Sequence, residues 1–341
     1  MNGKRMLSIL TILILLLAAG AAMAQFDQEH DDQNLPDPTV SPLVVPDVGE
    51  FPTAPAGETG AYGEEGEGDL LQPDGLGATS YFEVTSDQQS GVVAPYFRFM
   101  RRLALKVHVP IIFNKTFHYF GTDADASGIG DMTVDGEYVW PLHIRRGQLR
   151  TQFSVKLPTG DDEKTTNVNG TDYATPLGTG TTDIIARTTF TKSWRDFDLL
   201  VGGLYRTNSS ADQTVQYGTV TTTTSITAGD VIVGSAFGRY RVAPRWWIHA
   251  GVAVTILGDG DGESTSHDTS DGSTTTSTWT MDTSGTQVDI FPGISYELGA
   301  LTPFVGARIP VSTSYDNSMI DDSRDASLIV QVSYSPQQLM P

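Results

Sequence analysis

Residues Gln148–Leu157 read QLRTQFSVKL, and apolar and polar side chains alternate along this stretch. Leu149 and Phe153 fall on one face, whereas Arg150 and Lys156 fall on the other. Successive side chains of a β-strand point to opposite sides of the sheet, so this period of two predicts a strand with one apolar and one polar face. The same period returns along most of the chain, which predicts an all-β protein.

Twelve segments from Thr79 onward have strand character, and no convincing helical period separates them. Most run to about ten residues or more, beyond the mode of about five or six in soluble proteins and close to the length that crosses a bilayer on a tilt. The predicted strands are 79–86, 92–99, 102–112, 131–141, 148–157, 182–194, 197–207, 230–242, 245–257, 287–298, 301–312 and 327–335.

The connections between these strands alternate between tight turns and long polar loops. Outer-membrane barrels have this contrast, with short turns on the periplasmic side and long loops outside. Alternation alone fits a soluble sandwich as well, but the strand lengths, the connections and the even strand count favour an antiparallel transmembrane β-barrel. The tight turns are Met100-Arg101, Leu142–Gly147, Arg195-Asp196, Ala243-Pro244 and Gly299-Ala300, and the long loops are 113–130, 158–181, 208–229, 258–286 and 313–326.

Aromatic residues gather at the tight-turn ends of the predicted strands. Amphipathic rings at one depth are typical of the girdle that a barrel places at a membrane interface, whereas a sandwich would spread them through its core. The predicted girdle comprises Phe97, Phe99, Trp140, Trp194, Phe197, Tyr240, Trp246, Trp247, Tyr296 and Tyr334.

The N-terminal part of the chain predicts export. Lys4 and Arg5 precede an apolar run, and Ala22-Met23-Ala24 forms a small-residue cleavage site, so residues 1–24 are expected to be a secretory signal peptide. Residues 25–78 contain many acidic residues but no Lys or Arg, and are rich in Pro and Gly, which predicts a disordered acidic leader. Residues 79–341 are then the barrel, located in the bacterial outer membrane.

Composition excludes several classes of function. The chain has no cysteine, which excludes thiol catalysis, thiolate metal sites and disulfides. Its formal net charge of −20 argues against nucleic acid as a partner, because the phosphate backbone would be repelled. The expected partners are outer-membrane lipid and a small-molecule solute, and the oligomeric state is left open.

Two glycine-rich stretches resemble ligand sites in composition only. Pro176–Asp183 (PLGTGTTD) has the glycines of a phosphate cradle, but they open a strand rather than a helix. Gly258–Glu263 (GDGDGE) begins like a calcium loop, but Ser264 stands where that loop requires glycine and no glutamate follows at its twelfth position. Loosely held divalent ions at an acidic surface are the favoured interpretation, so no metal or cofactor residues are predicted.

Enzymatic activity is not expected either. A Ser-His-Asp mechanism needs a histidine beside a hydroxyl and a carboxylate, and only His108 and His249 lie on the polar faces of strands. A lone strand histidine is more often an interior residue with a hydrogen-bonded neighbour. No catalytic residues are therefore predicted.

Charged residues on the strands predict which face is the lumen, because a charged side chain facing lipid at the midplane costs roughly 2–4 kcal/mol. Two interpretations stay open, namely mutual salt bridges that fill a narrow interior and a path for a solute. The predicted lumen-lining residues are Arg98, Lys106, His108, Asp135, Glu137, Arg150, Lys156, Arg187, Asp198, Arg206, Arg239, Arg241, His249, Asp289, Glu297 and Arg308.

Three stretches in this order resemble a known family: Gly128–Tyr138 (GIGDMTVDGEY), Val155–Asp161 (VKLPTGD) and Pro176–Asp183 (PLGTGTTD). They are similar to outer-membrane transporters labelled as phenol-degradation meta-pathway proteins, of the MetA-pathway of phenol degradation type. In that family a strand beginning GxGD precedes a strand ending KxPTGD, a variable loop and PxGTG. The resemblance covers roughly residues 79–335 and implies a barrel that admits small, often hydrophobic or aromatic molecules, with no catalytic residues. The long acidic leader departs from the family pattern.

The expected function is a channel or transporter for passive uptake of small solutes. The alternative is a structural or surface-interaction barrel with a closed lumen, whose Thr-rich loops (Thr219–Thr227 and Ser264–Thr286) bind a partner or lipid.

Overall fold

The computed structural model describes residues 75–85, 87–99, 102–119, 122–142, 147–161, 164–168, 171–217, 220–281, 283–298, 301–315 and 326–334. The predicted signal peptide and most of the predicted leader lie outside these residues. The described part of the chain contains no helix that is long and apolar enough to cross a membrane.

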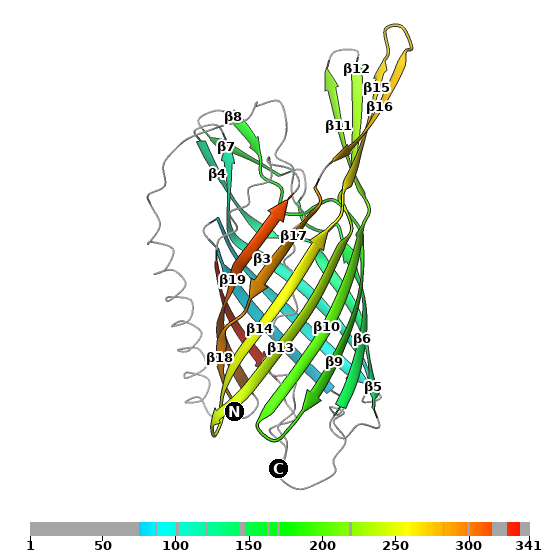
Figure 1. Cartoon of the computed structure of the whole chain (residues 1–341). Helices are drawn as coiled ribbons and strands as arrows, with labels where there is room; N and C mark the ends of the chain where they lie inside the picture. Colours follow the sequence, from blue (N-terminus) through cyan, green and yellow to red (C-terminus); the bar gives the residue numbers. More distant parts are fainter. Residues whose placement is uncertain are drawn as a thin grey trace.

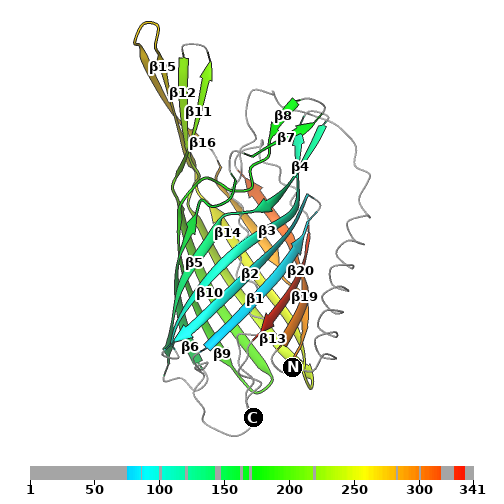
Figure 2. The same cartoon turned by 180° about the vertical axis from the view of Figure 1, so that it is seen from behind.

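An antiparallel sheet of twelve strands closes on itself as a barrel (Figures 1 and 2). Neighbours in sequence are neighbours in the barrel wall, and pairing of the first strand with the last closes it. The predicted fold and strand count are therefore confirmed. The wall consists of β1 (Gly75–Val84), β2 (Gln88–Phe99), β3 (Leu103–Tyr119), β5 (Met132–Pro141), β6 (Gly147–Leu157), β9 (Asp183–Ser193), β10 (Phe197–Asn208), β13 (Val231–Ala243), β14 (Trp246–Leu257), β17 (Gly285–Ile290) with β18 (Gly293–Tyr296), β19 (Leu301–Tyr315) and β20 (Ser327–Tyr334).

β17 and β18 together form one wall strand, interrupted at Phe291 and Pro292. Proline has no N–H group, so it breaks the regular ladder at this point. The wall stays closed because Phe291 exchanges two backbone hydrogen bonds with Gly251 of β14, at 2.9 and 3.1 Å. The alternation of faces continues across the interruption, so the Phe291 side chain is buried in the barrel like Asp289 before it and Ser295 after it.

The two faces of the wall differ as the alternation predicts. Large apolar side chains such as Phe153, Val201 and Ile232 are exposed on the outer face. Polar and charged side chains on the alternate positions, such as Asp135 and Ser154, are buried inside. An exposed apolar belt around a closed sheet is the surface that lipid covers, so the barrel resides in the outer membrane.

Most of the predicted aromatic girdle lies on the outer face, where Trp140, Trp194 and Trp246 are between 43 and 49% exposed. Trp247 is an exception, and its assignment to the girdle is wrong. It is only 1% exposed because alternation along β14 turns it inward, opposite to Trp246. Inside the barrel its ring lies against the guanidinium groups of Arg239 and Arg241.

The long connections contain regular structure that the sequence prediction treated as loops. β4 (Thr122–Ile129) pairs with the extended end of β3, and β7 (Thr165–Val168) pairs with β8 (Thr171–Ala174). The four strands β11 (Ser210–Tyr217), β12 (Val220–Thr227), β15 (Gly260–Asp268) and β16 (Thr274–Met281) form a separate sheet. It projects beyond the barrel at the end opposite the tight turns (Figure 1). Threonine is abundant in these segments, and its β-branched side chain favours strands. The GDGDGE stretch is accordingly not a closed loop, because its last four residues begin strand β15.

The outward position of Val252 on β14 allows a test of the membrane face. Val252 is 40% exposed on the apolar belt, so Val252→Arg would place a charge against lipid and lower the free energy of unfolding by roughly 2–4 kcal/mol. Thr276→Arg in the exposed strand β16 is the matched control, with no expected loss. Urea unfolding in phospholipid vesicles measures both, and equal midpoints would contradict a lipid-facing Val252.

Candidate functional site

The barrel interior gathers most of the buried charge of the described residues. At its centre lies Glu137 on β5, whose side chain is 3% exposed. Its carboxylate oxygens lie 3.1 Å from Arg98 Nη2, 3.2 Å from Lys106 Nζ and 3.8 Å from Arg150 Nη1. These cations come from β2, β3 and β6, so one carboxylate joins four strands of the wall.

Two further carboxylates have a similar role. Asp135 Oδ2 lies 2.6 Å from His108 Nε2 and accepts a hydrogen bond of 2.7 Å from the side-chain amide of Gln152. Asp183 at the start of β9 is fully buried, and its Oδ2 lies 2.5 Å from Lys156 Nζ and 2.9 Å from Arg206 Nη2. Each acid thus holds partners on both sides of its own strand.

Around β13, β14 and β18 the interior charges pair near the tight-turn end. Arg239 donates from Nε to Asp198 Oδ2 at 2.6 Å, and its guanidinium lies 4.2 Å from the centre of the Trp247 ring. Trp247 in turn donates from Nε1 to Glu297 at 2.8 Å. His249 is buried beside Ser295, with 2.8 Å between His249 Nε2 and Ser295 Oγ.

All the residues predicted to line the lumen lie in the described part of the chain. The remaining ones include Arg308, which pairs with Glu83 at 3.1 Å, and Asp289, which accepts from Gln287 at 2.7 Å. Arg187 and Arg241 lie on the inner side of β9 and β13, where they are half-buried. Mutual ion pairing, one of the two interpretations, accounts for most of these contacts.

Sequence reasoning missed three acids that organise the interior: Glu83, Asp131 and Asp183. A signal was present for two of them, because Asp131 is the acid of the GxGD stretch and Asp183 ends PLGTGTTD. Both stand at the start of a wall strand, where alternation was not used to assign a face. Alternation extended to the first residue of β9 would have placed Asp183 inside, as a partner for Lys156 and Arg206.

Part of the interior is apolar. A buried cluster extends over β9, β10, β13, β14, β19 and β20 and over the break after β17. Three phenylalanine rings dominate it, and those of Phe237 and Phe291 lie 5.3 Å apart. The members are Ile185, Leu204, Val231, Val233, Phe237, Ala253, Leu257, Phe291, Phe304 and Ile329. This cluster is called the apolar wall from here on. It has no member on β2, β3, β5 or β6, but its own strands also carry inward charged residues such as Asp183, Arg206 and Arg239.

Glycines make room for the rings of the apolar wall. A Cβ atom on Gly251 would lie 2.0 Å from the Phe237 ring, and one on Gly293 or Gly306 would lie 2.4–2.5 Å from the Phe304 ring. No real Cβ atom approaches so closely, so the rings rest on bare backbone. Glycines inside strands mark such close approaches.

At the long-loop end of the barrel, Asp131 joins the three motifs that carry the family resemblance. One of its oxygens accepts from the backbone N–H of Gly160 at 2.9 Å. The other accepts from the backbone N–H and the hydroxyl of Thr179, at 2.7 and 2.8 Å. Lys156 Nζ also donates to Thr179 Oγ1 at 2.7 Å. The ends of the connection between β6 and β9 are therefore fastened to β5.

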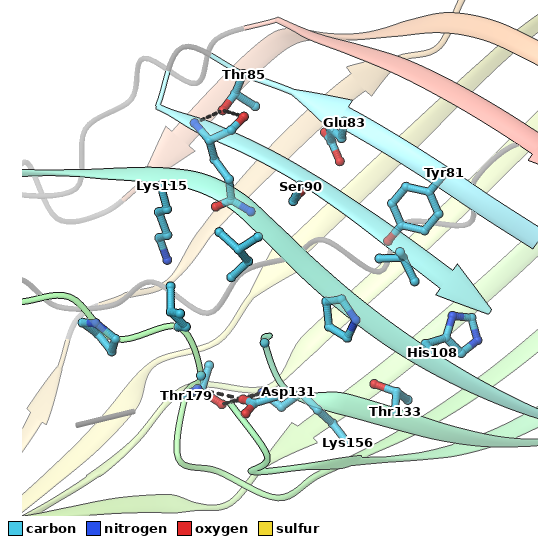
Figure 3. Close-up of a pocket in the computed structure, with 18 of the residues that line it drawn as sticks. Tyr81, Glu83, Thr85, Ser90, His108, Lys115, Asp131, Thr133, Lys156 and Thr179 are labelled. Carbon is cyan, nitrogen blue, oxygen red and sulfur yellow. Dashed lines mark hydrogen bonds and ion pairs between the residues drawn. The ribbon is translucent and has the colours of Figure 1, made fainter. Parts of the chain in front are cut away.

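Packing reinforces this arrangement, which we call the rim latch (Asp131, Gly160, Gly178 and Thr179). A Cβ atom on Gly160 would lie 2.7 Å from Gly178 Cα, and one on Gly178 would lie 2.5 Å from Asp131 Oδ1. Leu177, between the two fastened points, is buried against Ile112. A cavity of about 210 Å³ lies in the barrel directly beside this loop (Figure 3).

Asp131→Ala would leave two backbone N–H groups and a hydroxyl without their acceptor, at about 1–3 kcal/mol for each buried group. The connection between β6 and β9 should then open more often, and trypsin should cut after Lys164 at least about tenfold faster. Mass spectrometry of timed digests measures this rate. Asp125→Ala, which removes only an exposed hydrogen bond from Thr116, is the control, and equal rates for both variants would refute the latch.

Glu137→Gln would leave Arg98, Lys106 and Arg150 without their shared carboxylate in a buried site. Removing one partner of a buried ion pair costs about 3–5 kcal/mol, so the guanidinium midpoint of the detergent-solubilised barrel should fall. Glu297→Gln keeps an acceptor for Trp247 and should change the midpoint little. Indistinguishable midpoints for the two variants would show that Glu137 is not the organising charge.

One solved structure agrees with this fold, and others are more distantly similar. The COG4313 outer membrane channel from Pseudomonas putida F1 is similar with a TM-score of 0.53 and 14% identity, over 77% of this chain and 96% of that one. The KdgM porin in complex with disordered oligogalacturonate gives a TM-score of 0.41 and 10% identity, over 76% and 98%. OmpT, an outer membrane protein of Vibrio cholerae, gives 0.30 and 9%, over 76% and 95%.

No curated protein matches the chain by sequence. The model of one protein family does match, over residues 74–282, which is more than half of the chain and includes all three motifs joined at the rim latch. The chain is therefore an outer-membrane β-barrel that belongs to the family described as "Putative MetA-pathway of phenol degradation".

Proposed function

We propose that this barrel is a channel for passive uptake of small solutes, with a preference for solutes that carry a hydrophobic or aromatic part. The observation that supports this is a buried apolar cluster with three phenylalanine rings, gathered in a barrel interior whose charged groups are mostly paired with one another. Phe237, Phe291 and Phe304 lie on the apolar wall, whereas Glu137 and its three cations lie on β2, β3, β5 and β6.

A barrel that only needed a filled interior would gain nothing from gathering its inward apolar residues in one cluster. Ion pairs satisfy most of the buried charged groups, including those on strands of the apolar wall, so this wall does not have to be desolvated against unpaired charge. A solute with an apolar part can then follow the rings while its polar part stays near the charged residues. The proposal assigns the chain neither catalysis nor a cofactor.

Liposome swelling with the purified barrel tests the preference. Free phenylalanine and glutamine are both zwitterions of similar size, so their influx ratio reports on the apolar wall rather than on charge. We expect phenylalanine to enter faster, and Phe304→Ala to lower the ratio several-fold because it removes a ring from that wall. Phe153→Ala on the outer face is the control.

Two results would count against the proposal. Absence of conductance steps in planar bilayers would mean that the barrel is not a channel. A phenylalanine-to-glutamine ratio that Phe304→Ala leaves unchanged would mean that the apolar wall does not select the solute.

A surface-interaction role is the second candidate, and the projecting sheet favours it. β16 is exposed along nearly its whole length, and its edge is unpaired within the described residues, which is a surface to which another chain can add a strand. Deleting both hairpins, 210–227 and 260–281, separates the candidates. Loss of cell-surface attachment with unchanged solute influx would support the surface role, and unchanged attachment would argue against it.

A further inference from the structure

The cavity beside the rim latch is built from many strands of the wall. It lies between β1, β2, β3, β5, β6, β10 and β19 and the loop that precedes β9. Its volume of about 210 Å³ is below the range of about 300–1,000 Å³ for drug-sized ligands, so only a small solute fits. Figure 3 shows His108, Lys115, Lys156 and Thr179 arranged around it.

Positive side chains outnumber carboxylates around the cavity. The cations are Lys115, Lys156, Arg206 and Arg308, and the carboxylates are Glu83 and Asp131. Both carboxylates already have partners, since Asp131 accepts three hydrogen bonds at the rim latch and Glu83 pairs with Arg308.

Of the four cations, Lys115 differs from the others. Lys156 and Arg206 share the buried Asp183, and Arg308 lies against Glu83. Within the part of the chain that the structure describes, Lys115 has no ion-pair partner, and its ammonium lies 4.9 Å from the centre of the Phe117 ring. A half-buried ammonium beside a ring is available to an anion that enters the cavity.

A β-bulge brings Lys115 to this place. The pairing of β3 with both of its neighbours shifts register between Ile112 and Lys115. Ile112 is buried inside, and Phe113 is 49% exposed on the outer face. Strict alternation would send Lys115 outward, to the same side as Phe113. The extra residue reverses the phase, and Lys115 lines the cavity instead, which is a recurrent use of bulges beside functional sites.

The remaining lining is suited to an apolar body. Val92, Pro110, Ile112 and Leu177 line the cavity, together with the ring of Tyr81. Small-ligand sites commonly combine such a lining with a few polar groups that fix orientation. The combination here is one available ammonium among other cations, with aliphatic and aromatic surface around it.

We propose that this cavity is a binding subsite for a small monocarboxylate with an apolar body, such as an aromatic acid, and that Lys115 binds its carboxylate. This subsite proposal rests on the proposed function, because it names the class of solute that binds at the outer mouth of the channel. The site itself is defined by binding and exists whether or not the solute then crosses.

Calorimetric titration of the detergent-purified full chain with benzoate tests the site. Lys115→Gln should weaken benzoate binding at least about tenfold, because a charge-assisted hydrogen bond is lost, whereas Lys115→Arg should retain it. Lys192→Gln, at the tight-turn end of β9, is the matched control and should bind as the wild type does. Heat-modifiable migration in gels verifies that each variant is folded. Benzylamine, which has the opposite charge, should not bind.

Planar-bilayer recordings of the same proteins separate this proposal from the function on which it rests. Benzoate binding that depends on Lys115, in a barrel without conductance, would establish the site and refute the channel. A conducting barrel in which Lys115→Gln and wild type bind benzoate equally, or in which benzylamine binds equally well, would overturn the site and leave the channel intact.

Discussion

The structure depends on one constraint, which is that backbone N–H and C=O groups inside hydrocarbon must find partners within the protein. A sheet meets this constraint only when it has no edge, so β1 pairs with β20 and the wall closes. The constraint is also met at the break between β17 and β18. The proline there has no N–H group to pair, and the residue before it, Phe291, keeps two backbone hydrogen bonds with Gly251. Closure then separates every wall strand into a face for lipid and a face for the interior.

Closure also explains why the interior acids act as junctions. Side chains on the inner face of a barrel are brought side by side. A carboxylate on one strand therefore reaches cations on its neighbours and, as Glu137 does with Arg98, on the strand beyond. Glu137, Asp183 and Asp131 each use this geometry, the first two for cations and the third for backbone N–H groups of a loop. Removing such an acid therefore affects several strands at once.

Much of the fold could be predicted from the sequence because two simple lengths govern it. The two-residue period of apolar and polar side chains shows which face of each strand meets lipid. The bilayer thickness requires strands of about ten residues, which are long enough to be recognised one by one in the sequence. The projecting sheet was not predicted, because polar threonine-rich stretches such as Val220–Thr227 carry no apolar face to reveal a strand. Trp247 was misplaced because its proximity to a turn was given more weight than its phase along β14.

The interior could be predicted only in part. Charges on strands such as Arg98 and Asp135 indicate the inner face, since lipid excludes them. Inward apolar residues such as Phe237 carry no such signal in their own composition, and only their spacing from a charged residue, here Arg239 two positions later, places them inside. The sequence also gives no indication of the β-bulge after Ile112, although this bulge alone decides on which side of the wall Lys115 lies.

The glycines beneath the phenylalanine rings have a consequence for the shape of the pore. A ring that rests on bare backbone lies as close to the barrel wall as the main chain allows, and Phe237 and Phe291 also pack against one another at 5.3 Å. The contour on that side is therefore set by the thickness of an aromatic ring and the path of the main chain, both of which are stiff. A molecule sliding along the rings would meet a stiff surface, in contrast to the long, flexible arginines and lysines elsewhere in the interior.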